Sequence, residues 1–221
     1  MIISPYTDLE IELPEGPIGV SVSGGADSAI LLYFLMKYHK HKIYITTLAD
    51  RSKYLRNPKK SLDVVAKIVE LTKNENYEHM IRYVNQQTEE NLFKDLTFLI
   101  ENKQIIKFYQ GVTANPPDDI LHSNKHFSTL TTENHERNPN EFRVTDTTSM
   151  TRPWTNIDKK IIAKMYKNEG LLETLFPLTG SCEWQEHMPY INNGVDPYKD
   201  YCGKCWWCEE RLWGFNRLIN N

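Results

Sequence analysis

The sequence lacks an apolar stretch long enough to cross a membrane. Its longest apolar run, residues 29–36, is far shorter than the roughly 20 residues that a spanning helix needs. The acidic first residues also lack the basic and apolar regions of a secretory signal. We therefore expect a cytoplasmic protein with no membrane partner.

An excess of positive charge is also missing. The 221 residues carry 26 Lys and Arg against 29 Asp and Glu, a net charge of −3, so no direct nucleic-acid partner is expected. Hydrophobic residues make up 40% and charged residues 25%, which is ordinary for a globular chain of one domain with a small appendage. Arg is scarce while Lys and Asn are frequent, a bias typical of a viral or low-GC genome. For a viral protein, the expected location is the host cytoplasm.

Cysteine is scarce, and its placement is informative. Cys202, Cys205 and Cys208 stand within seven residues, and Cys182 is the fourth cysteine of the chain. Such clustering in a cytosolic protein favours metal over disulfides, and four thiolates suit a closed structural Zn²⁺ site. An iron–sulfur cluster is the alternative metal centre, and buried thiols without metal are the alternative to both.

Strand and helix patterns alternate along the first half of the chain. Four apolar strands are predicted at residues 17–23, 43–48, 78–84 and 105–109, and three helices between them at residues 29–39, 61–72 and 88–102. This alternation predicts an α/β fold, a Rossmann-like, doubly wound parallel sheet with helices on both faces.

The alternation stops at Gly111. Residues 111–140 are rich in Pro, Asn, Thr, Asp and His and predict an irregular insertion at the carboxyl edge of the sheet. A fifth strand at 142–145, a helix at 156–168 that ends before Gly170, and a helix at 206–218 are expected beyond it. The predicted organisation is one domain over residues 1–180 and a zinc-binding region over residues 181–221.

A Gly-Gly loop (residues 23–28) joins the first predicted strand to the first predicted helix. Gly24 and Gly25 let backbone N–H groups approach an anion closely, and the helix N-terminus adds partial positive charge. Ser23 and Ser28 add hydroxyl donors, while Asp27 can cap the helix or hold Mg²⁺ beside phosphates. The alternative is a tight turn followed by a capped helix. Neither the Walker pattern nor the dinucleotide fingerprint is present.

The string Ser23-Gly24-Gly25-Ala26-Asp27-Ser28 resembles the PP-loop of the N-type ATP pyrophosphatases. The resemblance implies the adenine nucleotide α-hydrolase-like fold, a bound ATP whose pyrophosphate lies on the loop, and adenine near residues 48–51. The nucleotide site expected on this basis comprises Ser21, Ser23, Gly24, Gly25, Ala26, Asp27, Ser28, Leu48, Asp50 and Gly111. Asp27 and Ser28 are expected to act in catalysis together with Lys159, whose ammonium can reach the phosphates if it is not simply a surface lysine.

The cysteine tail resembles the end of the 7-cyano-7-deazaguanine synthases. Its matching features are Cys182 preceded by Thr179-Gly180-Ser181, the run from Cys202 to Cys208, and then Arg211 and Phe215. The resemblance implies a ligase of queuosine-type 7-deazaguanine chemistry that uses ATP and ammonia to convert 7-carboxy-7-deazaguanine into its nitrile or amide. A homodimer is left open.

Three segments depart from that family pattern: residues 47–52, residues 111–118 and the long spacer between Cys182 and Cys202. Two other functions therefore stay open, a PP-loop nucleic-acid thiolase with an iron–sulfur cluster and a non-catalytic ATP-binding protein. Arg152 is a similar candidate to Lys159 for the phosphates, with the same alternative of a surface side chain. The histidines of residues 111–140 are interpreted as surface residues, and the aromatic residues of the tail as packing around the metal.

Overall fold

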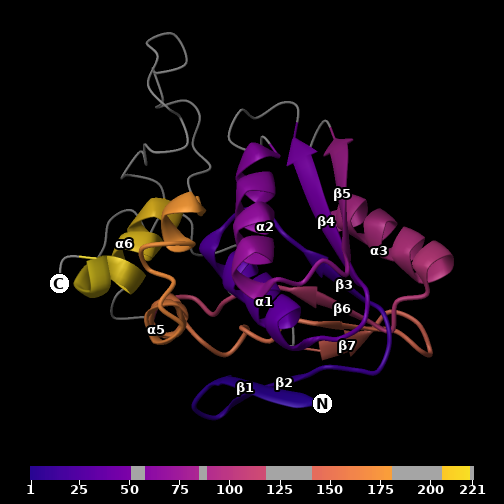
Figure 1. The fold of residues 1–221 in the computed structure, drawn as a ribbon, viewed down its shortest axis with the longest axis horizontal. Helices are drawn as coiled ribbons and strands as arrows, with labels where there is room; N and C mark the ends of the chain where they lie inside the picture. The colour runs from indigo at the N-terminus through magenta and orange to yellow at the C-terminus, as the bar shows by residue number, and fades with distance from the viewer. Residues whose placement is uncertain (51–57, 85–88, 118–140, 181–205, 220–221) are drawn as a thin grey trace, which may run out of the picture.

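A computed structural model describes residues 1–50, 58–84, 89–117, 141–180 and 206–219. Within these ranges, one sheet runs in the order β5-β4-β3-β6-β8-β7 (Figure 1). Its strands are β3 (Ile18–Ser21), β4 (Ile43–Asp50), β5 (Tyr77–Val84), β6 (Lys107–Gln110), β7 (Glu141–Arg143) and β8 (Ser149–Thr151). All neighbours are parallel except β7, which runs antiparallel to β8 at the edge.

The helices alternate with the strands as predicted. They are α1 (Ala26–Tyr38), α2 (Lys59–Thr72), α3 (Glu89–Lys103), α5 (Lys159–Asn168) and α6 (Trp206–Ile219), with a short 3-10 helix η2 (Phe176–Leu178) between the last two. The predicted α/β class is therefore confirmed, with a Rossmann-like parallel sheet between two layers of helices.

The two faces of the sheet follow from the alternation of side chains along each strand. Ile18 and Val20 of β3 lie in the main core with α1, α2 and α5, whereas Phe108 of β6 packs on the other face with Leu99 of α3. Gly19 of β3 faces this second side, where a Cβ would lie 2.6 Å from the Phe108 ring. The α1 side is the larger core, and it buries the whole of the longest apolar run.

The order of the strands reverses beside β3. The chain moves outward from β3 to β4 and β5, then crosses to β6 on the opposite side of β3. In such sheets, ligands bind at the carboxyl ends of the strands where the order reverses. The Gly-Gly loop follows β3 and Gly111 follows β6, so both stand at this point.

Several local predictions need correction. The hairpin of β1 (Ile2–Tyr6) and β2 (Leu9–Glu12) was not predicted, because its strands are short and β1 contains Pro5, a residue that argues against a strand. The strand expected at 142–145 is the antiparallel edge strand β7, and the fifth parallel strand is β8, only three residues long. Helix α5 begins three residues later than predicted because Asp158 caps it, its Oδ1 accepting the N–H of Lys160 at 2.9 Å.

The predicted zinc region lies largely outside the described residues. Cys182, Cys202 and Cys205 fall there, as does most of the predicted insertion, residues 118–140. Cys208 is described and is buried at the start of α6. No helix of the described part combines the length and apolar character needed to cross a membrane.

Candidate functional site

The Gly-Gly loop (residues 23–28) turns from the end of β3 into the first turn of α1. Gly24 adopts a φ of +82°, and a Cβ there would lie 2.9 Å from Cβ of Lys60 and 3.0 Å from the Ser61 nitrogen. Both the conformation and the close approach of α2 require glycine at this position. Gly25 is the N-cap of α1, and no side chain caps the helix.

The carbonyl groups of the loop are bonded to the protein behind it. Gly24 O accepts the N–H of Gly180 at 3.0 Å, and Ala26 O accepts the hydroxyl of Tyr166 at 2.9 Å. In a trans peptide, the next N–H points the opposite way, so the N–H groups of Gly25 and Asp27 point away from these partners. The first N–H groups of a helix also have no intrahelical acceptor. The loop therefore presents N–H groups where an anion can reach them.

Two serine hydroxyls lie at the same place. The Oγ atoms of Ser23 and Ser28 are 3.2 Å apart, and Ser28 Oγ donates to Gly25 O at 3.2 Å. Ser23 Oγ in turn accepts the N–H of Gly25 at 3.3 Å. Ser23 is exposed while Ser28 is buried, so one hydroxyl faces solvent and the other supports it from beneath.

A buried lysine meets the loop from α5. Lys159 is 4% exposed, donates a short hydrogen bond to Asp27 Oδ2 and lies 3.5 Å from Glu210 Oε2 of α6. Gly214 makes room for it, because a Cβ on Gly214 would lie 2.4 Å from Cγ of Lys159. The alternative of a surface lysine is therefore wrong, and Lys159 contacts Asp27 of the Gly-Gly loop. Glu210 was missed by the sequence analysis, since only the packing of α6 on α5 brings it here.

The second carboxylate oxygen of Asp27 can accept a further ligand. Its Oδ1 is buried and has no hydrogen-bond partner among the described residues. Mg²⁺ commonly takes only one or two carboxylates and completes its shell with water and substrate phosphates, so Asp27 fits a Mg²⁺ that arrives with a nucleotide. The described residues contain no group of three or more metal-ligating side chains.

A hydrogen-bond chain from β5 fixes the residue before the loop. Val22 O accepts the hydroxyl of Thr47 at 2.8 Å and that of Ser61 at 3.3 Å. The Thr47 proton is used in this bond, so His79 Nε2–H donates to Thr47 Oγ1, at 2.8 Å. Burial lowers the pKa of His79 from 6.5 to about 4, which keeps the ring neutral near pH 7. Nothing in the local sequence around His79 signals this role.

The other predicted nucleotide residues lie along the same edge. Ser21 ends β3 in register with Thr46, and Leu48 lies two residues further along β4, where β3 has already ended. The side chain of Asp50 is outside the described residues. Gly111 packs on the first turn of α1, where a Cβ would lie 2.7 Å from the Ser28 nitrogen, so close packing accounts for glycine there.

Arg152 and Arg211 are buried but face different parts of the molecule. Arg152 follows β8 and donates to Gln110 Oε1 at the end of β6, at 2.7 Å. Arg211 of α6 donates to Thr179 Oγ1 at 2.9 Å and stacks 3.8 Å from the centre of the Phe176 ring. Phe215 stacks on the same ring at 4.0 Å. Arg211 and Phe215 therefore fasten α6 to the segment that leads to Gly180.

No protein-family model and no curated protein matches the chain. Among solved structures, it is similar to the phosphoadenylyl-sulfate (PAPS) reductase of Candida auris, solved as a phosphate complex, with 10% identity over 69% of this chain and 72% of that chain and a TM-score of 0.40. A likeness of this size says nothing about the reaction. The chemistry of this chain has to be inferred from its own residues.

Proposed function

We propose that the chain binds ATP at the Gly-Gly loop and uses it to adenylate an oxygen of a deazapurine acid, which ammonia then attacks. The observation that carries the proposal is the loop itself, with N–H groups directed outward, two serine hydroxyls, and Asp27 paired with a buried lysine. This arrangement suits a polyphosphate better than a simple structural turn. The Gly24 and Ala26 carbonyls are bonded to the protein behind the loop, whereas the Gly25 N–H bonds, at 3.3 Å, only to the exposed Ser23 hydroxyl, which a phosphate oxygen can replace.

The loop and Lys159 have separate tasks in this proposal. The N–H groups and the Ser23 hydroxyl hold the β- and γ-phosphates, because backbone donors at a helix N-terminus stabilise negative charge without further ordering. The Lys159 ammonium stabilises the charge that develops on the leaving pyrophosphate. Asp27 orients Lys159, and its Oδ1 would hold Mg²⁺, which when bound screens the phosphates.

The proposed reaction has two activations. A carboxylate oxygen of 7-carboxy-7-deazaguanine attacks the α-phosphate, pyrophosphate leaves, and ammonia displaces AMP to form the amide. The amide oxygen is then adenylated by a second ATP, and loss of AMP with a proton gives the nitrile. The protein contributes positioning and electrostatic stabilisation, so its effect depends on how rigidly the loop is held.

The four cysteines complete the proposal. We expect Cys182, Cys202, Cys205 and Cys208 to bind one structural Zn²⁺. Cys208 precedes Glu210 by two residues on α6, so a metal bound there would act on the site through the position of Glu210 and Lys159.

The decisive experiment measures AMP release from ATP with 7-carboxy-7-deazaguanine and ammonia. The proposal expects AMP only when all three are present, and a loss of at least a hundredfold in Asp27→Asn and Ser28→Ala but not in the exposed control Lys160→Ala. ATP binding without AMP from any acid would overturn it in favour of a binding protein. AMP release that requires a nucleic acid, in a protein containing iron and sulfide, would identify a thiolase instead.

A further inference from the structure

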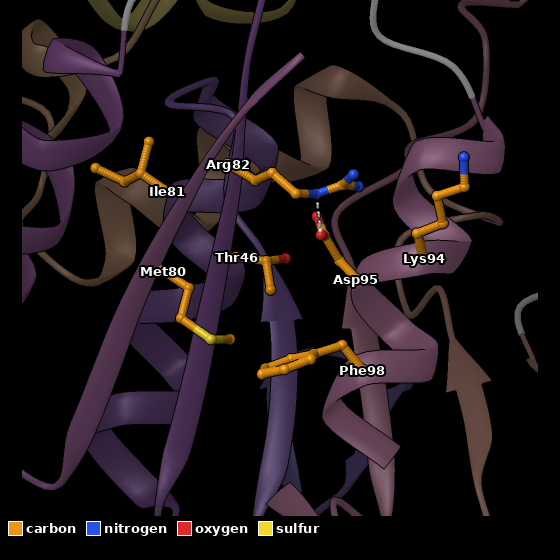
Figure 2. Close-up of a pocket in the computed structure, with 7 residues that line it drawn as sticks. All are labelled: Thr46, Met80, Ile81, Arg82, Lys94, Asp95 and Phe98. Carbon is orange, nitrogen blue, oxygen red and sulfur yellow. Dashed lines mark hydrogen bonds and ion pairs between the residues drawn. The ribbon is translucent and has the colours of Figure 1, made fainter. Parts of the chain in front are cut away.

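A hollow of about 350 Å³ lies on the α3 face of the sheet. Strands β4 and β5 form its floor and α3 forms one wall (Figure 2). Thr46, in the floor, is the register partner of Ser21, and its carbonyl accepts the N–H of Val22 at 2.8 Å. The hollow therefore adjoins the site through β4, but none of its lining residues belongs to the loop.

One end of the hollow is apolar. Figure 2 shows Met80 of β5 and Phe98 of α3 on opposite sides of this end. Phe98 is 47% exposed, although it lies next to a space large enough to receive a ring. Aromatic rings stack on phenylalanine, and methionine sulfur contacts rings favourably, so this end suits a flat aromatic group.

The other end of the hollow carries the Asp95 carboxylate, and only one of its two oxygens has a hydrogen-bond partner among the described residues. Asp95 Oδ1 accepts a short hydrogen bond from Nε of Arg82, whose guanidinium also contacts Asn91. Asp95 Oδ2 is buried and has no hydrogen-bond partner among the described residues. Burial raises the pKa of Asp95, although the Arg82 bond acts in the opposite direction. An unsatisfied buried oxygen is costly, so a donor placed there contributes to binding.

The neighbouring charge selects the kind of donor. Arg82 already neutralises Asp95, so a cationic amine would meet the guanidinium as a like charge. A neutral N–H avoids that repulsion and still satisfies Oδ2. The volume falls at the lower end of the range for small-ligand pockets and admits a bicyclic base.

We infer that this hollow binds a neutral aminoheterocycle, a flat base whose exocyclic amine donates to Asp95 Oδ2 while its ring lies between Met80 and Phe98. Two sources share this chemistry, a free aminopurine-type base and the base of a nucleotide held at the loop. The inference concerns binding alone and does not depend on the reaction proposed above.

The probe is 2-aminopurine, whose fluorescence is quenched when it stacks, compared with purine, which has the same ring but no amine. The wild-type protein should bind 2-aminopurine at least about tenfold more tightly than purine, because purine leaves Oδ2 unsatisfied. Asp95→Asn should remove this difference, since the amide must turn its oxygen to Arg82 and place its NH₂ against the ligand amine. Phe98→Leu should weaken both ligands, and Asp63→Asn, an exposed carboxylate of α2, should change neither.

Equal affinity for the two ligands, no binding by the wild-type protein, or an unchanged preference in a folded Asp95→Asn would overturn the inference. Urea unfolding of each variant shows whether it is folded. Competition then identifies the source: displacement by ATP assigns the hollow to the nucleotide base, and displacement by 7-carboxy-7-deazaguanine alone assigns it to the acceptor. If the protein binds 2-aminopurine but releases no AMP with ATP, 7-carboxy-7-deazaguanine and ammonia, the proposed reaction is refuted and the binding site in the hollow is retained.

Discussion

A buried ammonium, that of Lys159, lies against the Gly-Gly loop. Lys159 is almost fully buried between Asp27 and Glu210, so its charge is compensated from two helices. Taking charges out of water is costly, and removing one member of a buried pair leaves the other uncompensated. Lys159 therefore has a structural task as well as the phosphate-binding task proposed for it.

Replacing Lys159 should affect stability and activity together. We expect Lys159→Met to lower the free energy of unfolding by about 3–5 kcal/mol, because two carboxylates then share an apolar environment. The matched control is Lys160→Met, since Lys160 is exposed and lies 4.6 Å from the centre of the Trp213 ring; it should cost at most about 1 kcal/mol. Urea denaturation measures both. Equal effects of the two substitutions would contradict the buried cluster.

The neutral ring of His79 predicts a dependence of stability on pH. Its pKa is about 4 in the folded chain and 6.5 ordinarily, so between these values the unfolded chain binds a proton that the folded chain does not. Stability should fall as pH drops from 6.5 to 4, by on the order of 1–2 kcal/mol once partial exposure of the ring is allowed for. The control is His79→Gln, which keeps a donor for Thr47 and should flatten this part of the stability–pH curve.

At the scale of helices and strands, much of the fold follows from local patterns. The apolar strands and the helical spacing at residues 61–72 are strong signals, and the corresponding elements β3 to β6 and α1 to α3 begin within a few residues of the predicted bounds. Strand β8 was missed because a strand of three residues is too short to show the alternation of apolar and polar side chains. The loop could be predicted from its glycines, whereas Glu210 and His79 reach the site only through long-range packing and pairing of strands, which a single sequence does not reveal.

Gly111 shows how tightly two of these elements meet. A Cβ at this position would lie within 2.8 Å of the backbone of Asp27 and Ser28, and backbone atoms give way less easily than a side-chain tip. Gly111→Ala should therefore cost about 1–3 kcal/mol and weaken ATP binding, because the first turn of α1 has to move. Gly170→Ala is the control: its φ of +67° is unfavourable for alanine, but no atom lies within 4 Å.

The measurement pairs urea unfolding with titration of ATP for both glycine variants. The control should lose roughly 1 kcal/mol of stability and keep its ATP affinity, since a Cβ on Gly170 meets no atom within 4 Å and displaces nothing. Undiminished ATP affinity in a folded Gly111→Ala protein would show that the contact between β6 and α1 does not shape the loop.

At the scale of the whole molecule, the last helix is part of the site. Helix α6 packs on α5 (Figure 1), and Phe215 lies in the main core with residues of α1. Glu210 extends from α6 to Lys159, and Arg211 holds the segment that precedes Gly180, whose N–H bonds to the loop. We therefore expect that a change that loosens α6 weakens the proposed binding of nucleotide at the loop.

Metal removal tests this connection. If the four cysteines hold zinc as proposed, the protein should contain about one zinc per chain, and a chelator should weaken ATP binding by roughly tenfold or more while destabilising the C-terminal region. Cys208→Ser should act in the same direction, and added zinc should restore only the chelated wild-type protein. Elemental analysis gives the metal. Iron with sulfide, or unchanged ATP affinity after complete zinc removal, would contradict the prediction.

The connection from β5 to β6, which passes across β4 and β3, also affects the order in which parts of the chain can fold. Strand β3 pairs with β4 soon after it in the chain, but its other neighbour, β6, is synthesised some ninety residues later, and the loop's partners Trp154, Lys159 and Tyr166 later still. Contacts of such long sequence separation slow folding, because chain entropy must be lost before they form. On the ribosome, the Gly-Gly loop is therefore made well before its partners, and a nascent chain that stops before residue 150 lacks the bonds from Trp154, Lys159 and Tyr166 that hold the loop.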